Sequence, residues 1–250
     1  MKERVVVVTG AAGGIGSSIA KRFHKAHAIV IAVDHFSAKE KLVKITTGLG
    51  ILGLLGDVSD IDDVGRMIDP IMNSFGRIDV LVNAAGILVS DGVLAKTKKE
   101  NLLKLKSVMN INYWGTFHCC YVVLPHMRAR EYGRIINISS IMAGCADPGN
   151  IVYSSSKAAV SSFTKTLAHE APFNKDGVPF DITVNAVAPG IIETAMTEGL
   201  HGKYMEQYYM RVPSQRKGKP EEIADAVYFL ANNQYMNGVI LPVDGGYTAK

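Results

Sequence analysis

The segment VVVVTGAAGGIG, from Val5 to Gly16, decides the fold class of this chain. Its first half is a β-branched run typical of a buried strand, and its second half is rich in glycine. Glycine permits a tight turn and a close approach of the backbone to a ligand, and a following helix presents its N-terminal N–H groups at the same place. A glycine loop between the first strand and a helix therefore favours a phosphate-binding turn over an ordinary connection, although its spacing is not the literal G-x-G-x-x-G pattern.

The rest of the chain alternates short apolar runs with longer amphipathic stretches. The runs predict seven strands: Arg4–Thr9, Ile29–Asp34, Ile51–Gly56, Val80–Asn83, Arg134–Ile138, Ile182–Ala186 and Val239–Val243. The amphipathic stretches predict helices at Gly14–Ala26, Ile61–Phe75, Lys99–Arg130, Tyr153–Ala171 and Glu221–Ala231. Continuous apolar strands that alternate with helices indicate an α/β fold, a doubly wound parallel sheet of Rossmann type with helices on both faces. No repeat or linker divides residues 1–250, so we expect one domain.

Composition excludes several classes of protein. The 250 residues are 48% apolar and 20% charged, and the net charge of +4 is spread along the chain without a basic block, so nucleic-acid binding has no support. No stretch reaches the length of a membrane span, and the apolar start stops too early for a secretion signal. Three cysteines (Cys119, Cys120 and Cys145) are too few for a disulfide framework or a zinc site. We expect no metal, no membrane partner and a cytoplasmic location.

Tyr153 and Lys157, in the stretch YSSSKAAV, lie four residues apart. On a helix this spacing places both side chains on one face. An ammonium ~4 Å from a phenol, at an effective dielectric of ~20, contributes up to ~4 kcal/mol. That energy would lower the pKa of tyrosine from ~10 by up to ~3 units. The pair therefore predicts a proton donor and acceptor tuned to neutral pH, the range in which such a group works best.

Together, these motifs resemble the short-chain dehydrogenase/reductase superfamily over essentially the whole chain. Further segments of the same kind follow in order: LVNAAG at Leu81–Gly86, MNINYWG with Asn112, RIINISS ending in Ser139 and Ser140, NAVAPG ending in Gly190, and VDGG at Val243–Gly246. Gly13 makes the glycine loop fit both TGxxxGxG and TGxxGxxG, and the second form marks a longer branch that includes epimerases and dehydratases of nucleotide sugars. The length of the chain and the terminal VDGG favour the shorter, single-domain branch.

The resemblance implies a set of site residues. The catalytic group would be Asn112, Ser140, Tyr153 and Lys157. The cofactor would be held by Gly10, Gly14, Ile15, Gly16, Asp34, Asp57, Val58, Asn83, Ala84, Gly86, Tyr153, Lys157, Pro189, Gly190, Ile192 and Thr194. Asp34 ends the second predicted strand, where a carboxylate can bind both ribose hydroxyls of NAD and repels a 2′-phosphate. We therefore expect NAD rather than NADP, with the alternative that Asp34 only caps a turn.

The implied reaction is hydride transfer between the nicotinamide and a secondary alcohol or ketone. Ser140 and Tyr153 would hydrogen-bond to the substrate oxygen, Tyr153 would exchange the proton, and Asn112 would position a water that links Lys157 to solvent. Two alternatives stay open: an isomerase or dehydratase that oxidises its substrate transiently, and a regulatory protein that binds NAD without catalysis. A homotetramer built through the helix at Tyr153–Ala171 and the one before it is the assembly that the family implies.

A segment at about 191–215 is expected to cover the substrate. It is rich in methionine and tyrosine (Met196, Tyr204, Met205, Tyr208, Tyr209 and Met210), and Met142 and Ile191 would add to the same wall. Such side chains suit a moderately apolar small molecule. The same residues would equally serve to fix the segment to the core.

Overall fold

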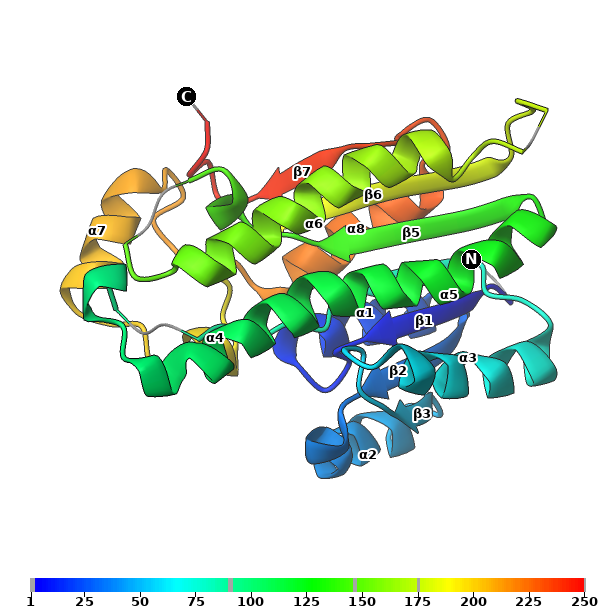
Figure 1. The fold of residues 1–250 in the computed structure, drawn as a ribbon, viewed down its shortest axis with the longest axis horizontal. Helices are drawn as coiled ribbons and strands as arrows, with labels where there is room; N and C mark the ends of the chain where they lie inside the picture. The colour runs from blue at the N-terminus through cyan, green and yellow to red at the C-terminus, as the bar shows by residue number, and fades with distance from the viewer. Residues whose placement is uncertain (1–2, 90–91, 146–147, 175, 250) are drawn as a thin grey trace.

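The computed structural model describes residues 3–89, 92–145, 148–174 and 176–249. These residues form a parallel sheet of seven strands in the order β3-β2-β1-β4-β5-β6-β7, with helices on both faces (Figure 1). The strands are β1 Val5–Thr9, β2 Ile29–Asp34, β3 Leu52–Leu55, β4 Val80–Asn83, β5 Tyr132–Ile138, β6 Asp181–Pro189 and β7 Ile240–Val243. The helices are α1 Gly14–Lys25, α2 Lys39–Thr47, α3 Ile61–Phe75, α4 Leu102–Met109, α5 Gly115–Ala129, α6 Ile151–Glu170, α7 Lys203–Arg211 and α8 Pro220–Asn232.

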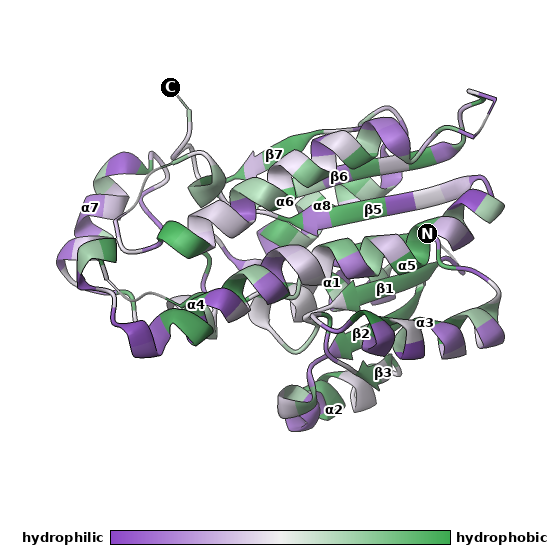
Figure 2. Cartoon of the chain, viewed as in Figure 1, coloured by the Kyte–Doolittle hydropathy of each residue, from purple (hydrophilic) through white to green (hydrophobic). Residues whose placement is uncertain are grey.

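The continuous apolar strands are explained by two cores, one on each face of the sheet. In β1, Val6 and Val8 face a core that is completed by α1 and α8, whereas Val5 and Val7 face a second core completed by α3, α5 and α6. All five residues of β1 are buried, because successive side chains point to opposite faces and both faces are covered. Figure 2 shows β1 as hydrophobic along its length, while α3 and α4 carry hydrophilic residues.

The order of the strands reverses between β1 and β4, which are paired neighbours although two other strands separate them in the sequence. The loops that leave β1 and β4 diverge there to opposite faces, and ligands of doubly wound sheets bind in the crevice that results. Here the two loops are joined directly: the Thr9 hydroxyl accepts hydrogen bonds from the N–H groups of Ala84 and Ala85, both at 3.2 Å. The sheet thus brings the glycine loop next to the LVNAAG segment.

Every predicted strand is present, and the bounds of β2 and β4 are those expected. The strand predicted at Ile182–Ala186 was too short: β6 continues to Pro189 and carries the chain to the edge of the crevice. The helix predicted at Lys99–Arg130 is interrupted. It consists of a 3₁₀ turn, then α4, then a π-helical stretch at Asn110–Trp114, and then α5. Among the described helices, none has the length and apolar character that crossing a membrane requires.

Two helices were not predicted, and both are short surface elements. In α2 only Leu42 and Thr46 are buried, and in α7 only Met205 and Tyr208. One or two inward residues per helix give little apolar periodicity, which is the signal from which sequence patterns predict helices. The single-domain reading of residues 1–250 stays a prediction.

Candidate active site

The glycine loop turns sharply between β1 and α1. Gly10 has a positive φ of 65°, and its carbonyl accepts a hydrogen bond from the N–H of Gly13 at 3.0 Å. A Cβ at Gly16 would lie 2.1 Å from the Gly10 carbonyl oxygen, and one at Gly10 would lie 2.7 Å from the backbone of Ala84. Only glycine fits these positions. Gly13 precedes α1 without a side-chain cap, so the helix N-terminus keeps its favourable field for an anion.

Gly16→Ala is expected to abolish binding of a dinucleotide. The added methyl group would overlap backbone atoms of Gly10 and Ala11, which cannot move aside without opening the loop. Titration of NADH with the purified variant, followed by nicotinamide fluorescence, measures the effect. Gly65→Ala in the interior of α3 is the matched control: its Cβ meets no atom within 4 Å, and it should bind as the wild type does. Wild-type affinity in Gly16→Ala would contradict the role of the loop.

The segment after β6 closes over the start of α1. A Cβ at Gly14 would lie 2.6 Å from the Thr194 side chain, so these two residues are in close contact. Ile192 is buried, and its carbonyl accepts a hydrogen bond from Thr197. Pro189 is the last residue of β6, and Gly190 follows it directly. The structure therefore places Thr194 beside the glycine loop and buries Ile192 in the same core cluster as Ala11, while Pro189 and Gly190 stand at the end of β6.

Asp34, at the end of β2, binds the glycine loop. One carboxylate oxygen accepts a hydrogen bond from the Ala12 N–H at 2.7 Å, and the other accepts one from the His35 N–H at 2.8 Å. Asp57 follows β3 and accepts hydrogen bonds from Ser59, while its other oxygen lies 3.9 Å from the His35 ring. Asp34 thus caps a turn, and its contact with the ribose stays a prediction. The turn that it caps is the glycine loop. The carboxylates of Asp34 and Asp57 make the carboxyl ends of β2 and β3 acidic.

The remaining residues that were predicted to contact the cofactor follow β3 and β4 or lie at the start of α1. Asn83 is buried and donates to the Asn137 side chain at 2.9 Å, which ties β4 to β5. Ala84 lies against Gly10, and Val58 is buried against Gly115. Ile15 packs partly buried at the start of α1. A Cβ at Gly86 would lie 3.2 Å from Asn112 Oδ1 and 3.4 Å from Lys157 Nζ, so Gly86 reaches the catalytic group.

The structure brings the predicted catalytic residues together at the carboxyl ends of β4 and β5. Ser140 follows β5, and its side chain hydrogen-bonds to that of Tyr153 and accepts a bond from the Met142 N–H at 3.1 Å. Lys157 Nζ lies 5.9 Å from the centre of the Tyr153 ring and donates to the Ile138 carbonyl at 2.8 Å. Ser139, by contrast, is buried and bonds to α6 through the Lys157 carbonyl and the Ser161 hydroxyl.

Asn112 is fully buried in the π-helical stretch between α4 and α5. Its amide exchanges two hydrogen bonds with the backbone of Ile87, at 2.8 and 3.0 Å, and donates a third to Ser156 at 3.0 Å. These bonds fasten the loop after β4 to α6. Ser156 and the Ile138 carbonyl are members of the site that sequence reasoning missed, because neither a serine one residue before the lysine nor a backbone carbonyl carries a sequence signal.

The prediction that Lys157 brings the pKa of Tyr153 towards 7 was wrong for this structure. Burial raises the pKa of Tyr153 above its usual value, and the hydrogen bond with Ser140 offsets this only in part. Burial also lowers the pKa of Lys157 to about 8. The sequence argument placed the ammonium ~4 Å from the phenol and neglected desolvation, which disfavours both charged forms.

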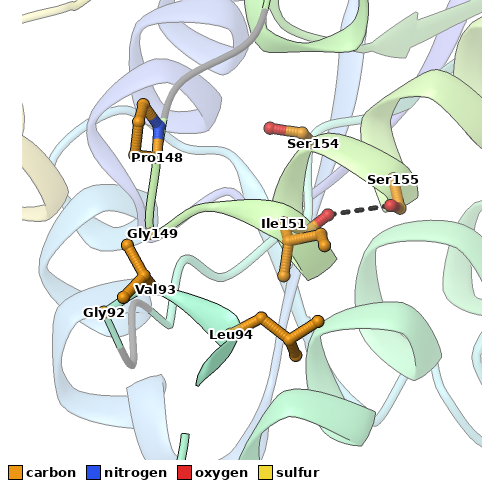
Figure 3. Close-up of a pocket in the computed structure, with 8 residues that line it drawn as sticks. All are labelled: Gly92, Val93, Leu94, Pro148, Gly149, Ile151, Ser154 and Ser155. Carbon is orange, nitrogen blue, oxygen red and sulfur yellow. Dashed lines mark hydrogen bonds between the residues drawn. The ribbon is translucent and has the colours of Figure 1, made fainter. Parts of the chain in front are cut away.

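A cavity of about 440 Å³ opens beside the start of α6. Figure 3 shows its walls: Val93 and Leu94 on one side, Pro148 and Gly149 on another, and Ile151 and Ser154 from α6. It contains no residue of the segment that was expected to cover the substrate. Met205 and Tyr208 from that segment are buried with Ile141, Ile191 and Val212, whereas Met196, Tyr204 and Met210 are exposed, so the covering role of the segment stays a prediction.

Comparisons with known proteins agree with this geometry. The family model described as enoyl-(acyl carrier protein) reductase matches residues 10–248. The 3-oxoacyl-[acyl-carrier-protein] reductase FabG of Thermotoga maritima is 38% identical over 251 residues, with 98% of each chain covered. The 2-(R)-hydroxypropyl-CoM dehydrogenase of Xanthobacter autotrophicus is 40% identical over 265 residues, with 98% of this chain and 99% of the relative covered.

Among solved structures, ElxO with NADP bound superposes with a TM-score of 0.86 at 34% identity, and all of both chains is covered. Two sequence relatives and one structure therefore match the chain from end to end, and both relatives are named as oxidoreductases of carbonyl or hydroxyl groups. The chain belongs to the short-chain dehydrogenase/reductase superfamily, as an NAD(P)-dependent oxidoreductase that acts on CH–OH groups.

Proposed function

We propose that this enzyme interconverts a secondary alcohol and a ketone with NAD, and that Tyr153 is its general acid and base. The observation that carries the proposal is the contact between Ser140 and Tyr153 at the crevice edge, with Lys157 Nζ 5.9 Å from the Tyr153 ring. Two hydroxyl groups at one point can both donate to a carbonyl oxygen and stabilise the negative charge that develops on it. Gly86 lies beside Asn112 and Lys157, which supports a cofactor position next to these residues.

The glycine loop supports dinucleotide binding, because Gly10 and Gly16 allow the turn between β1 and α1 to close tightly in front of the N-terminus of α1. When bound, the nicotinamide supplies or accepts the hydride. Ser140 holds the substrate oxygen, and Tyr153 delivers the proton in reduction or removes it in oxidation. Burial keeps the Tyr153 phenol protonated at neutral pH, ready to donate. Lys157 is fixed by the Ile138 carbonyl and stabilises the phenolate form when it arises.

A panel of secondary alcohols and ketones, assayed through the nicotinamide absorbance, tests the reaction class. We expect turnover with net formation or consumption of NADH. Turnover of substrate without a net change in NADH would favour the isomerase or dehydratase alternative, and NAD binding without any turnover would favour the regulatory one. The cavity between Leu94 and Ile151, at the start of the helix that carries Tyr153, supports the choice of substrates with an apolar substituent.

Asp34→Ser is expected to shift the preference for NAD over NADP towards NADP by about 10- to 100-fold. Removing the carboxylate removes the repulsion of a 2′-phosphate, and like charges in contact cost several kcal/mol. Since Asp34 also holds the Ala12 N–H, affinity for both cofactors will fall. The ratio of kcat/KM for NAD to that for NADP isolates the charge effect, with exposed Asp62→Ser as control. NADP, which ElxO binds, is the alternative, and a wild-type preference for it would overturn the argument.

We further propose that the enzyme is a homotetramer in the cytoplasm. Trp114, directly before α5, and Tyr121 on α5 are exposed aromatic residues; the ring of Trp114 stacks with that of His118, and the ring of Tyr121 with that of Phe117. An aromatic face on the helix that the family uses for assembly supports a partner chain there. The three cysteines are free, which suits a reducing compartment. The particle mass from light scattering tests the assembly.

A further inference from the structure

The segment from Ile191 to Gly218 leaves and rejoins the sheet edge at one point. The N–H of Glu193 donates to the Gly218 carbonyl at 2.9 Å, and the N–H of Gly218 donates to the Ile191 carbonyl at 2.9 Å. These two bonds close the base of an excursion, the lid, that carries α7 at its far end (Figure 1). A lid fixed only at its base would leave α7 free to move relative to the crevice.

Tyr208 on α7 makes a second connection. Its hydroxyl oxygen accepts a hydrogen bond from the Ile191 N–H at 3.0 Å, and the side chain is 6% exposed. A Cβ at Gly190 would lie 2.9 Å from this hydroxyl and 3.0 Å from Cα of Asp244. The backbone that follows Pro189 is therefore held between the Tyr208 hydroxyl and the segment after β7, and Gly190 is the residue that permits this.

The C-terminal segment supports Tyr208 from the other side. The rings of Tyr208 and Tyr247 stack with their centres 5.5 Å apart and their planes at 20°. The Ser214 N–H donates to the Gly245 carbonyl at 3.1 Å, and a Cβ at Gly246 would lie 2.9 Å from Pro213. The VDGGYT terminus thus packs along the lid, next to α7 (Figure 1).

We propose that Tyr208 is a positioning residue: its hydroxyl connects α7 to the backbone of the clamp at Gly190–Ile192, so that the order of the lid and the affinity for the nicotinamide cofactor are coupled. The proposal rests on the proposed cofactor position. The bonded group is a buried backbone N–H, for which a partner is obligatory, and it lies one residue from Ile192. A change at this bond reaches the clamp directly, whereas the ring of Tyr208 acts through its stack on Tyr247.

Tyr208→Phe tests the coupling, because it keeps the ring and removes the bond. We expect the dissociation constant for NADH to rise about 10-fold, the effect of one hydrogen bond. Amide exchange in residues 191–218 should become faster, while the pH profile of kcat, which Tyr153 sets, stays the same. Tyr132→Phe is the matched control: its buried hydroxyl has no hydrogen-bond partner among the described residues, and it lies at the start of β5, the opposite end of the sheet. Tyr247→Leu, which removes only the stack, should give a smaller effect in the same direction.

Unchanged NADH affinity and unchanged amide exchange in Tyr208→Phe would overturn the coupling, and so would an equal loss in Tyr132→Phe. If Tyr208→Phe lowers the thermal stability, binding is measured well below its Tm. The variant is fully folded there, so a lower global stability alone does not change its affinity for NADH. The proposed function fails separately: it would be contradicted by wild-type enzyme that binds no NADH, or by full turnover in Tyr153→Phe.

Discussion

Tyr153→Phe is expected to reduce turnover by about 1,000-fold, within the range of about 10²–10⁴ that one positioned acid or base contributes. The hydroxyl is the only atom removed. Ser140 would keep its bond to the Met142 N–H, and Lys157 its bond to the Ile138 carbonyl. The glycine loop does not depend on the phenol, so the variant should still bind NADH. The loss therefore belongs to kcat, measured at saturating cofactor in both directions of the reaction.

The pH dependence of the wild type gives a second expectation for the same residue. Since burial raises the pKa of Tyr153, the protonated form predominates at neutral pH. The reductive direction, which needs the proton, should be fast at neutral pH and decline in alkaline solution, whereas the oxidative direction should accelerate. In Tyr153→Phe, the alkaline decline of reduction and the alkaline acceleration of oxidation should both be absent. A residual rate with the wild-type pH profile would show that another group moves the proton, and Tyr132→Phe controls for the loss of a buried phenol.

The strands could be predicted because their signal is burial on both faces, which is written directly in the sequence. The run Val5–Val8 has no polar position, and both cores of the molecule meet on it. The break between α4 and α5 could not be predicted in the same way. The stretch Asn110–Trp114 becomes π-helical where Asn112 bonds to Ile87, and that contact depends on a loop distant in the sequence.

For the site, the positions of Ser140, Tyr153 and Lys157 could be predicted, whereas their electrostatics could not. The spacing of Tyr153 and Lys157 fixes a common helix face, and both side chains lie there. Their pKa values depend on how deeply the sheet and the loops bury them, which no local pattern contains. The sequence argument considered only the attraction of a charge pair, and desolvation exceeds it here.

Lys157→Met is expected to have opposite effects on activity and on stability. Lys157 is 5% exposed, and burial lowers its pKa from 10.5 to about 8. At ~1.4 kcal/mol per pKa unit, this corresponds to a cost of about 3 kcal/mol for keeping the ammonium charged in the folded protein. Methionine removes that cost and retains most of the packing. Loss of the hydrogen bond to the Ile138 carbonyl costs about 1 kcal/mol. The free energy of unfolding should therefore rise by about 2 kcal/mol in the variant.

The sign of the pH dependence separates this explanation from better packing. Between pH 8 and 10.5 the unfolded chain binds more protons at Lys157 than the folded chain does, so wild-type stability from this group rises with pH in that window. Lys157→Met lacks the rise. Its advantage in denaturant unfolding should be largest below pH 8 and should disappear towards pH 10.5, whereas a packing gain would be independent of pH. The exposed control Lys21→Met should show neither effect.

Turnover of Lys157→Met should fall by about 100-fold or more, because the phenolate of Tyr153 loses its stabilising charge. A variant that is almost inactive, and whose extra stability fades between pH 8 and 10.5, would show that the enzyme keeps this buried charge for catalysis at a cost in stability.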